Sequence, residues 1–203
     1  MKTIVTALPG SGKTTTLKKL SELMPSISVV NYGDLMFEEA SRVYGVRHRD
    51  EMRNSLGLRE YQSLQIMAAK RIAELDGDIV VDTHSVIKTV FGYYPGLPVE
   101  CVNIIKPELV VYIECRPEDV VERRMRDIEA GAGRVREVAG VEEVAYDQDI
   151  GRMFVVSAAN AAMCYLKIIR LTYPQQYMFQ HAEDAAKQIA ETISEISRMV
   201  RKD

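Results

Sequence analysis

The sequence predicts an α/β fold, a three-layer sandwich in which a central five-stranded parallel sheet is flanked by helices. Two observations lead to this prediction. Short apolar runs alternate along the chain with longer segments of helical periodicity. A glycine-containing turn also stands directly between the first apolar run and the first amphipathic segment. We therefore expect ligands to gather at the edge of the sheet where the carboxyl ends of the strands meet.

The first strand, over residues 3–7, leads into the segment Ala7-Leu8-Pro9-Gly10-Ser11-Gly12-Lys13-Thr14. A helix follows, with Leu17, Leu20, Leu23 and Met24 on one face. Strand, glycine loop and helix are the context of a phosphate-binding loop, in which backbone N–H groups surround phosphate oxygens and the lysine binds the β- and γ-phosphates. The threonine hydroxyl faces Mg²⁺ in such loops. The expected ATP-binding residues are Pro9, Gly10, Ser11, Gly12, Lys13, Thr14 and Thr15.

The alternative interpretation is a glycine turn followed by a chance lysine. Strand, helix and the Lys-Thr pair all agree with the phosphate loop, so the predicted fold is of the P-loop NTPase type. One departure is Ala7, which stands where the pattern has a glycine. Alanine is tolerated there if its φ is negative.

The next segment reads as strand, helix and helix. A strand over residues 26–31 is followed by the turn Tyr32-Gly33-Asp34 and by a helix that Gly45 ends. A densely charged stretch, residues 47–53, leads into a short helix. A longer helix covers about 58–75, with apolar residues at helical spacing.

The remaining chain repeats the alternation. A buried strand over 78–82 is followed by residues 83–98, which read as mostly irregular because they contain Gly92, Pro95, Gly96 and Pro98. The later elements are a strand over 109–115, a helix over 117–131, a helix over 141–163, a strand over 165–172 and a helix over 182–200. No linker or internal repeat interrupts them, so residues 1–203 are predicted to form one domain.

Charged residues follow the predicted strand ends, where they should face one cleft: Lys13, Asp34, Asp82 and Arg116. Asp82 ends an apolar strand, a position suited to a magnesium-directing acid; the alternative is a turn or cap aspartate. Asp34 could share the water shell of the same ion, act as a helix N-cap, or do both. Mg²⁺ is thus the expected cofactor, held through Thr14, Asp34 and Asp82, mostly by way of water.

Phosphoryl transfer is assisted by cations that neutralise the equatorial oxygens, and arginine binds phosphate bidentately. The arginines form three groups, Arg47/Arg49/Arg53, Arg123/Arg124/Arg126 and Arg134/Arg136. A solvated helix face is the alternative for each. Arg123 and Arg126 are three residues apart and share a helix face, so they are favoured over Arg124.

The three histidines have no metal-ligand spacing. His84 lies two residues after Asp82, and it could contact a phosphate or a base, or only hydrogen-bond its loop. His48 and His181 are expected at the surface.

Composition excludes several classes. The 203 residues carry a net charge of -3, which argues against a nucleic-acid binder. Three widely spaced cysteines form no disulfide framework, so a reducing, cytoplasmic location is expected. The apolar runs are too short to span a membrane, and a strand at the N-terminus leaves no room for a signal peptide.

Four further segments resemble, in order, those of the archaeal-type adenylate kinases: Asn31-Tyr32-Gly33-Asp34, Arg49-Asp50-Glu51-Met52-Arg53, Asp82-Thr83-His84 and Gly92-Tyr93-Tyr94-Pro95-Gly96-Leu97-Pro98. The similarity extends to about residue 160. It implies reversible, magnesium-dependent phosphoryl transfer from ATP to AMP, giving two ADP. It also implies an AMP-binding segment at about 31–75, a short lid at about 127–140 and a homotrimer.

The resemblance also assigns residues. Lys13, Arg123 and Arg53 would be catalytic. AMP would be bound by Gly33, Asp34, Arg49, Arg53, His84 and Lys88, and the lid would carry Arg126, Arg134 and Arg136. Lys88 departs from the family, which tends to have arginine there, and a lysine cannot bind phosphate bidentately. The lid region also reads as longer than usual.

Three other functions fit part of the pattern. A small P-loop kinase acting on CMP, UMP or a non-nucleotide acceptor would share every phosphate-side feature. A nucleotide-dependent switch or binding module with slow hydrolysis would need a partner surface. A role in nucleic-acid processing is opposed by the net charge of -3.

Overall fold

The computed structural model describes residues 1–49, 51–130 and 139–200, with the backbone alone at Arg53, Asn54 and Val200. The strands are β1 (Lys2–Ala7), β2 (Ser28–Asn31), β3 (Ile79–Thr83), β4 (Val86–Thr89), β5 (Gly92–Pro95), β6 (Leu109–Cys115) and β7 (Tyr165–Leu171). The helices are α1 (Lys13–Leu23), α2 (Tyr32–Tyr44), α3 (Glu51–Asn54), α4 (Leu58–Ala73), α5 (Val99–Ile105), α6 (Pro117–Glu129), α7 (Val141–Ala162) and α8 (Gln180–Val200).

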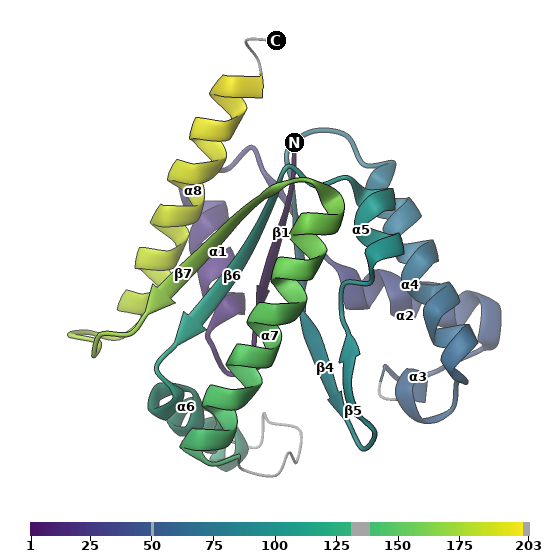
Figure 1. Ribbon diagram of the computed structural model, residues 1–203, viewed down its shortest axis with the longest axis horizontal. Coiled ribbons are helices and arrows are strands. Elements are labelled where there is room, and N and C mark those ends of the chain that lie inside the picture. The colour runs from purple at the N-terminus through teal and green to yellow at the C-terminus, as the bar shows by residue number, and fades with distance from the viewer. Residues whose placement is uncertain (50, 131–138, 201–203) are drawn as a thin grey trace.

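The main sheet has five parallel strands in the order β2-β3-β1-β6-β7. The central strand β1 pairs with β3 on one side and β6 on the other, with Thr3 opposite both Val80 and Leu109. Figure 1 shows the parallel strands fanning out from the N-terminus, so that their carboxyl ends form one edge. The predicted fold class is confirmed.

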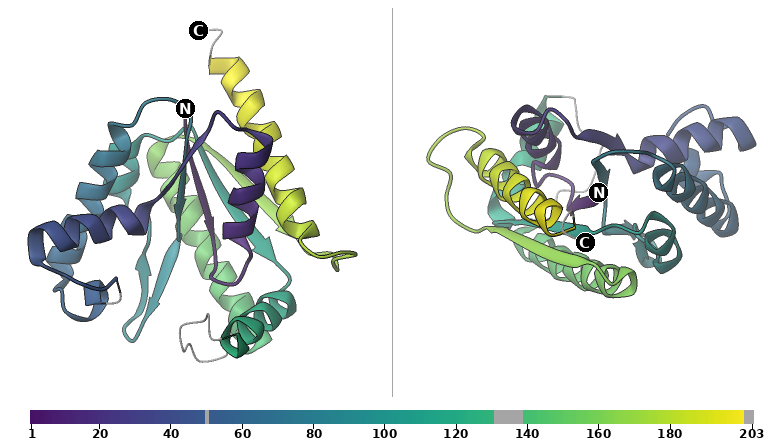
Figure 2. Two further views of the ribbon diagram at one scale, coloured as in Figure 1. Left: turned by 180° about the vertical axis from the view of Figure 1, so that it is seen from behind. Right: turned by 90° about the horizontal axis from the view of Figure 1, so that it is seen from above.

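Helices cover both faces of this sheet because the strand residues alternate between two cores. Val5, Val111 and Ile113 belong to a cluster with residues of α1 and α8, whereas Ile4 and Tyr112 belong to one with residues of α2, α4, α5 and α7. The view from above in Figure 2 separates the α1–α8 layer from the layer containing α5 and α7. Strands buried on both faces explain the continuous apolar runs in the sequence.

The structure corrects the prediction for residues 83–98. This segment contains an antiparallel hairpin, β4–β5, in which Val86 pairs with Pro95 and Thr89 with Gly92. Gly96 allows the hairpin to close, because its N–H donates to the Ser85 carbonyl (3.0 Å) and a Cβ would collide with the backbone of His84. The short helix α5, which the sequence pattern does not predict, follows directly.

The prediction that Asp34 caps α2 is also wrong. The N-cap is Asn31, whose side-chain oxygen accepts from the N–H of Asp34 (3.0 Å). Asp34 lies in the first turn, and its carboxylate pairs with Arg49 at 2.5 Å. The strand at 165–172 and the last helix lie within two residues of the predicted bounds.

Candidate active site

The phosphate loop connects β1 to α1, and two of its glycines take a conformation that other residues rarely adopt. Gly10 and Gly12 have φ values of +89° and +82°. Ala7 is the last residue of β1, and its backbone is not in the left-handed region. This meets the condition under which alanine can replace the glycine of the pattern. The hydroxyl of Ser11 is buried and has no hydrogen-bond partner among the described residues. An incoming phosphate oxygen would satisfy that hydroxyl and the N–H groups of the first turn of α1.

Lys13 begins α1 and contacts the carboxylate of Asp82, which lies near the end of β3. The other oxygen of Asp82 accepts from the side-chain amide of Asn31 (2.9 Å). Burial, with a smaller contribution from the nearby Arg49 charge, lowers the pKa of Lys13 to about 7. Phosphate oxygens beside the amine would favour its charged form.

Three clefts meet at this loop. The strand cleft, about 270 Å³, lies between the ends of β2 and β3 and the helices α2 and α4. Its residues are Lys13, Thr14, Asn31, Tyr32, Gly33, Met36, Arg49, Met52, Tyr61, Gln65, Asp82, Thr83, His84, Ile87 and Gly96. The guanidinium of Arg49 crosses directly above Gly33, where a Cβ would collide with it, and donates to Asn31 (3.1 Å). The guanidinium of Arg49 is therefore positioned to bind an anion in this cleft.

The helix cleft, about 630 Å³, lies between the loop, α6 and the start of α8. It is lined by residues 8–15, His84, Arg123, Arg126, Asp127, Gln175, Gln176, Tyr177, Met178, Phe179, His181 and Ala182. It therefore combines the phosphate loop with two arginines and an exposed aromatic segment. A polyphosphate with an attached base fits this arrangement of charge and apolar surface.

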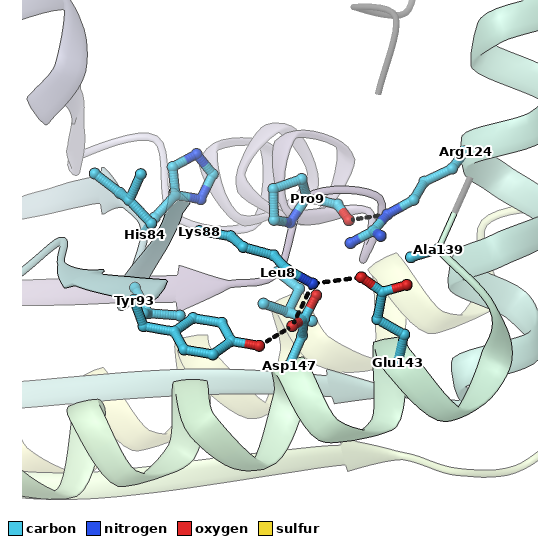
Figure 3. Close-up of a pocket in the computed structure, with 11 residues that line it drawn as sticks. Leu8, Pro9, His84, Lys88, Tyr93, Arg124, Ala139, Glu143 and Asp147 are labelled. Atoms are coloured by element: carbon cyan, nitrogen blue, oxygen red, sulfur yellow. Dashed lines mark hydrogen bonds and ion pairs between the residues drawn. The ribbon is translucent and has the colours of Figure 1, made fainter. Parts of the chain in front are cut away.

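The hairpin cleft, about 300 Å³, lies between the β4–β5 hairpin and α7, and Figure 3 shows its residues. Lys88 points across it to the carboxylates of Glu143 and Asp147 (3.3 Å to Asp147). The Tyr93 hydroxyl donates to Asp147 at 2.5 Å. From α6, the Nε–H of Arg124 donates to the carbonyl of Pro9 (2.9 Å).

Comparison with known proteins gives the family. A family described as an AAA domain matches residues 6–145. The chain is 40% identical to an adenylate kinase from Pyrobaculum aerophilum over 194 residues, covering 95% of this chain and 96% of that protein. It is 41% identical to an adenylate kinase from Pyrococcus horikoshii, covering 82% of this chain and 84% of that protein.

The chain belongs to the adenylate kinase family. Among solved structures, the fold is similar to that of shikimate kinase from Acinetobacter baumannii in complex with shikimate. The TM-score is 0.58, with 17% identity over 96% of this chain and 93% of that one. Shikimate kinase from Aquifex aeolicus gives a TM-score of 0.55 at 18% identity, covering 97% and 98%. These two likenesses concern the fold alone.

The structure brings most of the predicted site residues of this kinase together. The loop residues, Asp82, His84, Arg49 and Gly33 line the strand cleft or the helix cleft, and Arg123 and Arg126 line the helix cleft. His84 lines all three clefts, and its ring lies 3.4 Å from the carbonyl of Ala7. The side chain of Arg53 and the predicted lid residues Arg134 and Arg136 lie outside the described residues.

Other predicted residues lie elsewhere. Asp34, 60% exposed at its side chain, and Arg116, which pairs with Glu118 and Asp119, line none of the three clefts. Lys88 lines only the hairpin cleft. Helix spacing favours Arg123 and Arg126 over Arg124, yet the guanidinium of Arg124 contacts the phosphate loop.

One histidine and one segment of the site lie where the sequence did not predict them. His181 was expected at the surface, but it is only 2% exposed. Residues 175–179 line the helix cleft, although no motif marked them. Their position after the last parallel strand, at the ligand-binding edge of the sheet, was the available signal.

The residues around Lys13 fit a magnesium ion. Thr14 and Asp82 both line the strand cleft and offer hydroxyl and carboxylate oxygens, the donors Mg²⁺ prefers. No group of three or more His, Cys, Asp or Glu side chains suited to a metal occurs in the described parts of the chain. A donor set this small suits an ion that keeps several waters and is held largely by substrate phosphates.

Proposed function

We propose that the protein catalyses the reversible transfer of a phosphoryl group from ATP to AMP, giving two ADP, with Mg²⁺ as cofactor. ATP occupies the helix cleft and AMP the strand cleft. The observation that carries the proposal is that Lys13 and Thr14 line both clefts. Two nucleotides bound there would present their phosphates to each other at one lysine.

The chain's own residues suit an in-line transfer. An oxygen of the AMP phosphate is already anionic, so no general base is required. Lys13 and Arg123 neutralise charge on the transferred group, and Arg49 holds the AMP phosphate. Thr14 and Asp82 would hold Mg²⁺, which would supply electrostatic stabilisation of the phosphate oxygens.

The remaining assignments complete the proposal. Arg53 assists catalysis, and Gly33 and His84 contribute to AMP binding from the lining of the strand cleft. Asp34 contributes to AMP binding through its ion pair with Arg49, and also to the water shell of the metal. Lys88 contributes to AMP binding from the neighbouring hairpin cleft. Arg126, Arg134 and Arg136 serve a lid at about 127–140 that excludes water during transfer, and the AMP-binding segment covers about 31–75. The whole forms one kinase domain.

We also propose that the protein works in the cytoplasm as a homotrimer, as the family resemblance implies. No described helix is long and apolar enough to cross a membrane. Light scattering coupled to gel filtration measures the mass directly. A mass near that of one 22.9 kDa chain would contradict the trimer.

A coupled assay of ADP formation tests the function. ATP and Mg²⁺ are supplied with AMP, CMP, UMP or GMP as the acceptor. We expect turnover selective for AMP. Turnover with another monophosphate would show that AMP is not the preferred acceptor. Phosphate release without any acceptor would contradict transfer to a nucleotide.

A further inference from the structure

His181 is a buried residue in the first turn of α8, at the border of the helix cleft. Its Nε2 lies 2.8 Å from the carbonyl oxygen of Tyr173, and its Nδ1 lies 3.1 Å from Nη2 of Arg123. The ring also packs edge-on against the Tyr173 ring, with centroids 4.9 Å apart. Two hydrogen bonds and a ring contact therefore fix its orientation.

These partners define which ring nitrogen carries the proton. A carbonyl oxygen only accepts, so Nε2 must carry the proton that it donates to Tyr173. A guanidinium only donates, so Nδ1 must be unprotonated in order to accept from Arg123. The contacts are thus compatible with the neutral ring in one tautomer and with no other protonation state.

Arg123 is held at the phosphate loop by this contact. Its Nη1 lies 3.7 Å from Sγ of Cys115 and 3.8 Å from the point where a Cβ on Gly12 would stand. On the other side of the guanidinium, Nδ1 of His181 accepts a hydrogen bond from Nη2. The guanidinium therefore comes from α6, is oriented by α8 and stands next to the loop that α1 follows.

A second acceptor stands ready for a protonated ring. Oδ2 of Asp119 lies 3.8 Å from Nδ1 of His181, too far for a hydrogen bond with the neutral ring. This oxygen is buried and has no hydrogen-bond partner within the described ranges. A proton on Nδ1 would end the bond from Arg123, place two cations side by side and give Asp119 a donor.

We propose that His181 is a positioning residue, whose neutral ring orients Arg123 toward the ATP phosphates and whose protonation transfers the Nδ1 contact from Arg123 to Asp119. The proposal rests on the proposed binding of ATP in the helix cleft. Acid pH should therefore weaken ATP use, through a residue that need not touch the nucleotide.

The charges around the ring set the pH range. Burial lowers the pKa of His181, and the positive charge of Arg123 lowers it further, whereas the Tyr173 carbonyl, Asp119 and Asp184 act in the opposite direction. Asp184 is engaged by the Tyr173 hydroxyl at 2.5 Å. The net pKa lies below the ordinary value of 6.5, so the ring is neutral at pH 7 and gains its proton only in acid.

Kinetics of three variants test the role. His181→Leu removes the acceptor and should lower kcat/KM for MgATP about tenfold to a hundredfold at pH 7.5, the scale of one lost bond to a charged group. Arg123→Ala should lower it further. The double variant should be no worse than Arg123→Ala alone, because His181 acts through Arg123. A double variant that loses additional activity would overturn the proposal, since His181 would then act on ATP itself.

The dependence of kcat/KM on pH distinguishes positioning of Arg123 from a purely structural role, because a structural role would not change it. His181→Asn keeps an acceptor near the Nδ1 position but cannot titrate. The ratio of wild-type to His181→Asn kcat/KM cancels titration of MgATP and should fall as the pH drops below 6.5. Asp119→Asn should move this fall to lower pH, because the removed carboxylate favours the charged ring. A ratio that stays flat to pH 5 contradicts the proposal.

Nitrogen NMR of the wild-type histidine rings keeps the proposal testable if a variant does not fold. Only three histidines need assignment. We expect His181 to show protonated Nε2 and unprotonated Nδ1 at pH 7.5, and Arg123→Ala to raise its pKa. The opposite tautomer would refute the inference. If Arg123→Ala leaves kcat/KM unchanged while the tautomer is as expected, the proposed ATP site fails instead.

Discussion

Gly10 and Gly45 both have positive φ, but their surroundings differ. At Gly10 (φ +89°) a Cβ would lie 2.9 Å from Cγ of Arg124, whose stem covers the loop. At Gly45 (φ +69°), the C-cap of α2, a Cβ would meet nothing within 4 Å. Backbone strain alone acts at Gly45, whereas strain and collision act together at Gly10.

Gly45→Ala should therefore lower the free energy of unfolding by about 1–2 kcal/mol, the cost of a left-handed alanine, and leave kcat/KM intact. Gly10→Ala should cost about 1–3 kcal/mol more through overpacking and should also reduce kcat/KM for ATP at least tenfold. Urea unfolding and the ADP assay measure both effects. Equal losses of unfolding free energy in the two variants would show that the Arg124 side chain moves away from the new Cβ at no cost.

Lys13 gives a second test at this scale. Lys13→Met should reduce kcat by two orders of magnitude or more, because Lys13 lines both clefts, while the protein stays folded. Lys18→Met, at an exposed position of the same helix, is the matched control and should change kcat little. Near-normal turnover of Lys13→Met would remove the lysine from the mechanism.

Single residues were predictable where local chemistry demands them. Gly10, Gly12 and Lys13 are required by phosphate geometry itself. Arg124 and His181 were not predictable, because their roles depend on contacts between α6, α8 and the loop that lie far apart in sequence. Helix spacing gives the face of a Cβ, but a long arginine side chain can reach around that face.

The β4–β5 hairpin and α7 are joined by one polar cluster. Asp147 accepts from the Tyr93 hydroxyl and from Lys88, and its side chain is 9% exposed. Glu143 also pairs with Lys88, but its side chain is 49% exposed. Burial and Asp147 together raise the pKa of Tyr93 to about 12, so its hydroxyl remains a donor at neutral pH.

Asp147→Ala should destabilise the protein by about 1–3 kcal/mol, because it leaves a half-buried hydroxyl without its partner. Glu143→Ala should cost less than about 1 kcal/mol, as an exposed ion pair does. Denaturant unfolding at pH 7 compares them. If the two costs were equal, the hairpin would not depend on the buried carboxylate.

At the scale of elements, long periodic segments were predictable and short ones were not. The helices α7 and α8 contain enough turns for periodicity to show. The strands β4 and β5 have four residues each, amid glycines and prolines typical of loops. Their pairing is supported by contacts with α7 and with α4, and neither helix belongs to the local sequence.

The whole molecule places two clefts on either side of Lys13, and one molecule could fill both. Two adenosines joined through a chain of phosphates should inhibit competitively against both ATP and AMP, and bind more tightly than either because linkage raises the effective concentration of the second part. Adenosine tetraphosphate, which lacks the second nucleoside, is the control. Inhibition that is not competitive with AMP would contradict the assignment of the strand cleft.

The sandwich itself followed from alternation of strands and helices, but the strand order did not. Which strands become neighbours is decided by contacts across the sheet, such as those of β1 with both β3 and β6. The separation of the two clefts depends on that order. The sequence could therefore place residues at the ligand-binding edge without dividing them between ATP and AMP.

The helix cleft is completed by residues 175–179, 181 and 182, whereas the last of the described residues that line the strand cleft is Gly96. On the ribosome, some 80 residues separate these points, and at about 5–20 residues per second their synthesis takes roughly 4–16 seconds. Throughout that interval the growing chain contains the residues of the phosphate loop but lacks one wall of its larger nucleotide cleft. A half-made kinase is thus poorly equipped to consume ATP before the protein is finished.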